Sequence, residues 1–230
     1  MQDPLFARPL DSKRKNHEKV LGIWLFPASA PLKQITQQEE KWSNELSPKR
    51  KAEYKLSRGY ARFAISNIFK VNPLSIPLFS PPGKAPKLAE GWGYMSLSHC
   101  NNAVLIGWSP YAIGVDIERS KRVINSTSLG KRILGINEEK ILVEANGKKL
   151  NNIILSKWVE KEAAIKWQKG NIFKDIKKWE NLLNSNQYIH QSTRQIVCVE
   201  SIDYKDWKIA IAYNKKGHKS IPIICSKYTN

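Results

Sequence analysis

Apolar residues gather in short runs along the chain, and several runs have the length of β-strands. The clearest lie at 20–26, 103–108, 196–202 and 209–213. They interleave with two segments that have the character of helices, so strands and helices alternate through the chain. This pattern predicts an α+β protein with two α/β halves.

The longer upstream helix is predicted from Pro48 to Phe69. Proline is favoured at the first helical position, and the Asn-Pro pair at 72–73 ends the pattern. The apolar stripe of this helix consists of Leu56, Tyr60 and Phe63.

Strict alternation marks a strand at 114–118, Gly-Val-Asp-Ile-Glu. Such a strand buries Val115 and Ile117 and projects Asp116 and Glu118 from its other face, with Cα atoms about 6.6 Å apart. Two carboxylates at this separation suit a hard cation such as Mg²⁺. The alternative is a strand edge with a solvated acidic face.

The second helix is predicted to start at Ser156, a capping residue, and to stop near Gly170. It places Glu162 and Lys166 on one face, and Lys161 about 100° around the axis. Without further context, Glu162 and Lys166 form an ordinary pair worth about 0.2–0.5 kcal/mol to the helix.

These segments resemble the paired signature of the 4′-phosphopantetheinyl transferases, in their longer, surfactin-type branch. The resemblance rests on Gly-Val-Asp-Ile-Glu at 114–118 and on Trp-x-x-Lys-Glu-Ala-x-x-Lys at 158–166. A third element, Leu97-Ser98-His99, precedes the first by the expected interval. The resemblance extends over about residues 46–169. Three motifs in the family's order are more specific than any one of them.

The resemblance implies transfer of the 4′-phosphopantetheine group of coenzyme A to a serine of an apo acyl or peptidyl carrier protein, with release of 3′,5′-ADP. By the same resemblance, Asp116 and Glu162 are expected to ligate Mg²⁺ or Mn²⁺, with Glu118 as a third ligand, directly or through water. Glu162 is also expected to accept the serine proton, and Lys166 to neutralise phosphate charge.

The resemblance also implies a set of contacts to coenzyme A. Arg58 and Arg62 correspond to the family segment that grips the adenosine 3′-phosphate, while Ser98 and His99 contact its phosphates. Lys161 holds the same molecule. The loop at 83–86, Gly-Lys-Ala-Pro, has an alanine that the family's Gly-Lys-Pro lacks, so either Lys84 or Lys87 takes the phosphate role. The contacts to coenzyme A are predicted at Arg58, Arg62, Lys84, Ser98, His99 and Lys161.

The same family implies a pseudo-dimer of two similar α/β halves, with the active site between them. The division is expected near Pro110, which gives an N-terminal half at 1–110 and a C-terminal half at 111–230 with the metal-binding signatures. One copy of such a chain completes a site, so a monomer is expected.

Composition introduces one competing hypothesis. The formal charge of +18 and the pI near 9.8 are typical of proteins that bind nucleic acid or an anionic partner, a role without catalysis. Lysines scattered along the whole chain, without a zinc or dinucleotide motif, favour a solvated surface instead. No nucleic acid is therefore expected as a partner.

Cysteine usage and hydropathy bear on the compartment. The three cysteines, at 100, 198 and 225, cannot all pair within one chain, which favours a reducing cytoplasm. Cys100 follows His99 directly, but neighbours on an extended chain point to opposite faces, which argues against a thiol nucleophile paired with that histidine. No apolar run reaches the roughly 18 residues of a membrane span, so no membrane association is expected.

Overall fold

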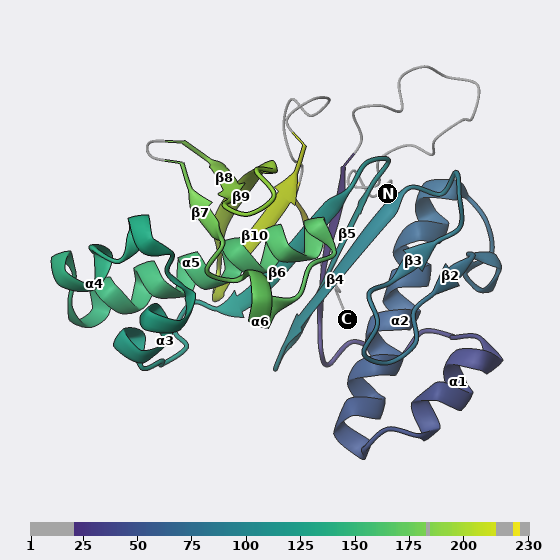
Figure 1. The fold of residues 1–230 in the computed structure, drawn as a ribbon. Coiled ribbons are helices and arrows are strands. Elements are labelled where there is room, and N and C mark those ends of the chain that lie inside the picture. Colours follow the sequence, from purple (N-terminus) through teal and green to yellow (C-terminus); the bar gives the residue numbers. More distant parts are fainter. Residues whose placement is uncertain (1–20, 183–184, 215–222, 226–230) are drawn as a thin grey trace. The chain divides into compact units, whose positions relative to one another are not determined.

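The computed structural model describes residues 21–182, 185–214 and 223–225, the last of these as backbone alone. The chain forms two compact units (Figure 1). The first unit contains residues 21–112 and a strand at 223–225, and the second contains residues 113–214. Helices and sheets occur in both, as the predicted α+β class requires.

The sheet of the first unit has four strands in the order β11-β1-β5-β4. β5 (Ala103–Ser109) pairs antiparallel with β1 (Gly22–Pro27) and with β4 (Tyr94–Cys100), while β11 (Ile223–Cys225) runs parallel to β1. The predicted strands at 20–26 and 103–108 are confirmed as β1 and β5, although Val20 itself lies outside the described residues.

Helix α2 (Pro48–Phe69) covers this sheet, and its predicted bounds are confirmed. Pro48 occupies its first turn, and Lys70 ends it in a left-handed conformation. The stripe at Leu56 and Tyr60 is buried against strand residues such as Trp108. The remaining elements of the unit are α1 (Gln37–Asn44), the 3₁₀ helix η2 (Pro73–Ser75) and the short pair β2 (Leu78–Phe79) and β3 (Lys87–Leu88).

The sheet of the second unit has five strands, all antiparallel, in the order β6-β10-β9-β8-β7. They are β6 (Ile113–Arg119), β7 (Trp179–Asn181), β8 (Gln187–His190), β9 (Ile196–Tyr204) and β10 (Trp207–Tyr213). The strands predicted at 114–118, 196–202 and 209–213 are confirmed within β6, β9 and β10.

Helix α5 (Gly147–Gln168) packs on β6, β10 and β9 of this sheet. Its buried face, which includes Val159 and Ala163, forms a core with Trp179 and Val199. The predicted start at Ser156 is wrong, because the helix begins nine residues earlier, after Asn146. Ser156 therefore lies inside the helix, where a capping side chain is tolerated once tertiary packing stabilises the helix.

A smaller helical cluster completes the second unit (Figure 1). It contains α3 (Ser126–Ile133), the 3₁₀ helix η3 (Ile136–Glu138) and α4 (Ile141–Glu144), while α6 (Ile172–Asp175) follows α5. Ile133, Leu150 and Ile154 form its apolar centre. This cluster fills the sequence between the two signature segments.

The boundary between the units falls between Ala112 and Ile113. The chain was predicted to divide at 110/111, with everything after that point in one half. β11 belongs instead to the first unit, because its partner is β1. That the two units repeat one structure stays a prediction.

Candidate functional site

The two signature segments of the second unit lie against each other, because strand β6 and helix α5 approach closely at Gly114. A Cβ atom at this position would lie 2.0 Å from the carbonyl oxygen of Ala163 and 2.5 Å from the amide nitrogen of Trp167. Only a residue without a side chain permits this contact. Gly114 therefore sets the distance at which the strand presents its carboxylates to the helix.

Asp116, Glu162 and Lys166 meet at this contact. The Nζ atom of Lys166 lies 2.6 Å from Oδ1 of Asp116 and 3.7 Å from Oε2 of Glu162. Asp116 is only 3% exposed, so its charge is shielded from water. The ammonium group of Lys166 thus offsets part of the negative charge of two carboxyl groups that come from separate elements.

Glu118, two residues further along β6, adds a third carboxyl group. It forms an ion pair with Arg122. Burial raises the pKa of Glu118, Arg122 opposes this shift, and the charge of Asp116 reinforces it. Asp116 and Glu118 were predicted to project from one face of the strand, and the influence of Asp116 on this pKa is consistent with that arrangement.

The charge balance acts most strongly on Glu162. Burial raises the pKa of its carboxyl group to about 7, the negative charges of Asp116 and Glu118 act in the same direction, and Lys166 opposes them. A carboxyl group with a pKa near neutrality can exchange a proton at physiological pH. This is the property that a general base requires.

The donor atoms of these residues decide whether they could hold a divalent metal. Among the described residues, no three His, Cys, Asp or Glu side chains are arranged so that they could hold a metal ion together. In this structure the cation beside Asp116 and Glu162 is the ammonium group of Lys166. The donors themselves fit a hard cation, because carboxylate oxygens are the ligands that Mg²⁺ takes.

Residues 112–212 match a family model described as the 4′-phosphopantetheinyl transferase superfamily. This segment is similar to a domain of that superfamily. Its limits nearly coincide with the second unit, and it includes the whole cluster of carboxylates and lysine. The match supports a transferase of the 4′-phosphopantetheine group. No curated protein matches the chain in sequence.

Lys161, next to Glu162 in the superfamily domain, has partners that its predicted role did not include. Its side chain is 0% exposed, and Nζ donates a hydrogen bond of 2.7 Å to the carbonyl oxygen of Ile133 and forms an ion pair with Glu138. Burial lowers its pKa, which Glu138 counteracts. Lys161 connects α5 to the helical cluster, and its role at coenzyme A stays a prediction that its burial does not favour.

Arg62, in the first unit, is likewise committed. It is 2% exposed and forms a double interaction with Glu39, with Nε and Nη2 at 2.8 and 3.0 Å from the carboxylate oxygens. Its other donors bind the carbonyl oxygens of Pro73, Ile76 and Leu78. Since a guanidinium has five N–H groups, none is left for a phosphate. The contact of Arg62 to coenzyme A stays a prediction, and it would require some of these contacts to be exchanged.

Arg58, one turn earlier on α2, is half-buried. Its Cζ lies 4.4 Å from the centre of the Tyr54 ring, and its Nε and Nη1 donate to the carbonyl oxygen of Ser80 and to Oγ of Ser57. These contacts occupy fewer of its donors than those of Arg62. Arg58 thus keeps the capacity to bind an anion.

The lysines of the predicted phosphate loop are both exposed. Lys84 lies in the turn after β2, next to Gly83 with φ of 74°, and Lys87 begins β3. The positive φ suits glycine and explains the turn. Neither lysine has an ion pair within the described residues, so the choice between them stays open.

Ser98 and His99 lie on β4, as neighbours on an extended strand. Ser98 is buried, whereas the His99 side chain is 56% exposed and its Nε2 lies 3.7 Å from the carboxylate of Glu53 on α2. The His99 side chain is thus accessible. Their predicted role at phosphates stays a prediction.

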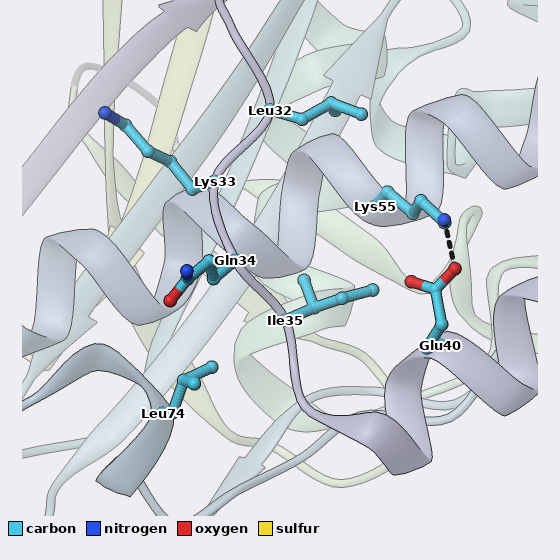
Figure 2. Close-up of a pocket in the computed structure, with 7 residues that line it drawn as sticks. All are labelled: Leu32, Lys33, Gln34, Ile35, Glu40, Lys55 and Leu74. Atoms are coloured by element: carbon cyan, nitrogen blue, oxygen red, sulfur yellow. Dashed lines mark hydrogen bonds and ion pairs between the residues drawn. The ribbon is translucent and has the colours of Figure 1, made fainter.

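The first unit has a cavity of about 460 Å³ beside α1 and α2 (Figure 2). Figure 2 shows the ion pair between Lys55 and Glu40 at one side of this cavity, and the Lys33 side chain points away from that pair. The remaining lining residues are Leu32, Gln34, Ile35 and Leu74. None of the side chains predicted to bind coenzyme A lines this cavity.

Two features of the site were missed in the sequence. Glu138, in the segment between the signatures, is buried and pairs with Lys161. Nothing in its local pattern distinguishes it from the neighbouring Glu139, which is exposed. Gly114 was read as part of a motif, but a glycine inside a strand is itself a signal of close backbone approach.

Among the helices of the described residues, none has both the length and the apolar character needed to cross a bilayer.

Proposed function

We propose that this protein transfers the 4′-phosphopantetheine group of coenzyme A to a serine hydroxyl of an apo acyl or peptidyl carrier protein and releases 3′,5′-ADP. The observation that carries the proposal is the meeting of Asp116, Glu162 and Lys166 within the superfamily domain. The surfactin-type branch, a monomeric state and a cytoplasmic location are parts of the same proposal.

In the proposed reaction the serine oxygen attacks the β-phosphorus of coenzyme A, and the bond from this phosphorus to the bridging oxygen of the α-phosphate breaks. The serine proton moves to a carboxylate oxygen of Glu162, which carboxyl-group chemistry allows when the hydroxyl lies within hydrogen-bond reach. Lys166 neutralises charge on the phosphates. Phosphoryl transfer depends mainly on such positioning and neutralisation.

Asp116 and Glu162 would hold Mg²⁺ or Mn²⁺, and Glu118 would bind it directly or through water. The metal supplies orientation of phosphate oxygens and electrostatic stabilisation. With a metal ion in place of the ammonium group beside Asp116, Lys166 would be available to the phosphates. The cluster would thus have a cation both without metal and with it, which explains why its buried carboxylates are tolerated.

For coenzyme A we propose contacts from Arg58, Ser98 and His99 and from either Lys84 or Lys87. Arg62 and Lys161 are left out of this set, because the donors of both are bound within the protein. We assign both a structural role.

The proposal is tested by intact-mass spectrometry of apo carrier proteins incubated with the protein, coenzyme A and Mg²⁺. We expect a mass gain of one phosphopantetheine that EDTA abolishes. Asp116→Ala should lose this gain, whereas Asp206→Asn, an exposed carboxylate outside the cluster, should retain it.

The competing hypothesis of a basic binding module predicts another result. In that case no mass gain occurs with any fatty-acid or peptide-synthetase carrier, and nucleic-acid binding falls steeply with salt. Asp116→Ala would leave that binding unchanged. This combination would overturn the proposed transferase.

A further inference from the structure

The second unit has a cavity that the proposed reaction does not use. Its volume is about 670 Å³, and it lies between α3, α5 and the segment at 172–178 that contains α6. Its apolar lining consists of Ile133, Trp158, Ile172, Phe173 and Ile176. None of these residues belongs to the carboxylate cluster formed by Asp116, Glu118 and Glu162.

The apolar part of the cavity lies where two hydrophobic clusters of the unit meet. Trp158 and Ile176 pack against both the core between α5 and the sheet and the cluster around α3. Each of them is only partly buried. Phe173 at the margin is 87% exposed, a costly position for a large aromatic side chain without a partner.

The polar part of the cavity is entirely basic. It consists of Lys131, Arg132, Lys174, Lys177 and Lys178. Lys178 pairs with Asp175 at 3.7 Å. Within the described residues, the other four have no ion pair. Four uncompensated cations beside an apolar surface attract a ligand that is negatively charged at one end and apolar at the other.

The dimensions of the cavity decide between a small ligand and a partner helix. Ligand pockets typically enclose about 300–1,000 Å³, and this cavity lies within that range. Its walls are short, because α3 has 8 residues and α6 has 4, which correspond to about 12 and 6 Å of helix. A bound helix of three to four turns would extend well beyond them.

We propose that this cavity binds an anionic amphiphile, a compact molecule with an alkyl chain and a carboxylate or phosphate head group. The alkyl chain lies against Trp158 and Ile176. The head group lies among Lys131, Arg132, Lys174 and Lys177. This binding is separate from the transfer reaction and does not depend on it.

The test is isothermal titration of the full chain with decanoate, decyl phosphate and uncharged decanol. We expect saturable binding of one molecule of at least one of the two anions, and binding of decanol at least about tenfold weaker. The anion that binds more tightly identifies the source as a carboxylate or a phosphate. Phe173→Ser should weaken both, since it removes apolar contact area.

Charge reversal provides the matched control. Lys174→Glu/Lys177→Glu should weaken anion binding by at least about tenfold, whereas Lys148→Glu/Lys149→Glu, with the same change in net charge on the same unit, should not. The first pair and the control pair are both exposed, so neither change disturbs the core.

Three outcomes would overturn the proposal. They are equal affinity for decanol, equal loss in the two double variants, and no saturable binding of either anion. If neither anion binds but an acidic amphipathic peptide does, the cavity is assigned to a protein partner instead.

Discussion

Among single residues, Glu162 has an environment that changes its chemistry near neutral pH. Its carboxyl group lies on a helix that faces a strand bearing two more carboxyl groups, and Lys166 supplies only one positive charge to Asp116 and Glu162. Burial and these charges raise its pKa to about 7. The folded protein therefore holds a proton on Glu162 that the unfolded chain has already released.

This linkage gives a pH dependence with a definite sign. Because the folded pKa lies above the ordinary value of 4.5, folding stability falls as pH rises from about 4.5 to about 7, and the loss is complete above that range. Glu162→Gln should remove this loss, so that above pH 7 and without metal the variant is more stable by about 1–3 kcal/mol.

Urea unfolding at pH 5 and pH 8 in EDTA measures this effect. Glu144→Gln, an exposed carboxyl group on the same unit, serves as the control and should change neither value. The same Glu162→Gln protein should be folded but slower in transfer by about 100-fold or more, the contribution of a general base. Normal rates in that variant would remove Glu162 from the mechanism.

Between elements, the close approach of β6 and α5 depends on Gly114. An added methyl group would meet the helix backbone, which cannot rotate away as a side chain could. The strand and helix would have to separate, and the carboxylates of the cluster would separate with them.

Gly114→Ala should therefore destabilise the protein by about 3 kcal/mol or more. In the molecules that stay folded, metal binding should be weaker. Gly147→Ala is the matched control. It starts the same helix, and a Cβ there has open space, so only the cost of its φ of 50° remains, about 1 kcal/mol. Comparable losses in the two variants by thermal unfolding would contradict the argument.

A second connection between elements is the buried pair of Lys161 and Glu138. Removal of one partner leaves an uncompensated charge in the interior, so Glu138→Gln should cost about 3–5 kcal/mol. Glu138→Leu combined with Lys161→Met should recover most of this loss. A double-mutant cycle by urea unfolding measures the coupling.

The same pair separates the two roles considered for Lys161. If Lys161 is structural, the double variant should bind coenzyme A with nearly unchanged affinity. A large loss of affinity in a protein that remains folded would restore Lys161 to the coenzyme A site.

For the whole molecule, the second unit has the topology of an insertion. Its first and last strands pair, with Ile113 opposite Tyr213, and the first unit resumes at β11. Opposed residues in an antiparallel pair lie about 4.5–5.5 Å apart, so the two ends of the unit are neighbours. The unit also has its own apolar cores.

Residues 113–214 produced alone should therefore fold cooperatively and bind Mn²⁺ through Asp116 and Glu162. They should not transfer phosphopantetheine, because Arg58, Ser98 and His99 are absent. Chemical unfolding and Mn²⁺ electron paramagnetic resonance test the first expectation. A fragment that remains unfolded would show that the unit depends on the first one for stability.

The sequence by itself determined the strands, the helix α2 and the identity of the carboxylate cluster. These follow from local periodicity and from short motifs, as with Val115 and Ile117 alternating with Asp116. It misplaced the start of α5, because packing on the sheet stabilises residues whose local signals resemble a helix end.

Only the tertiary structure decided which basic residues remain available. Arg62 and Lys161 match the motif as well as Arg58 and Lys166 do, yet Glu39 and Glu138 bind them in the interior. Those partners lie 23 residues away in each case, beyond the reach of any local pattern. The pKa of Glu162 has the same origin, since it depends on charges brought together from a strand and a helix.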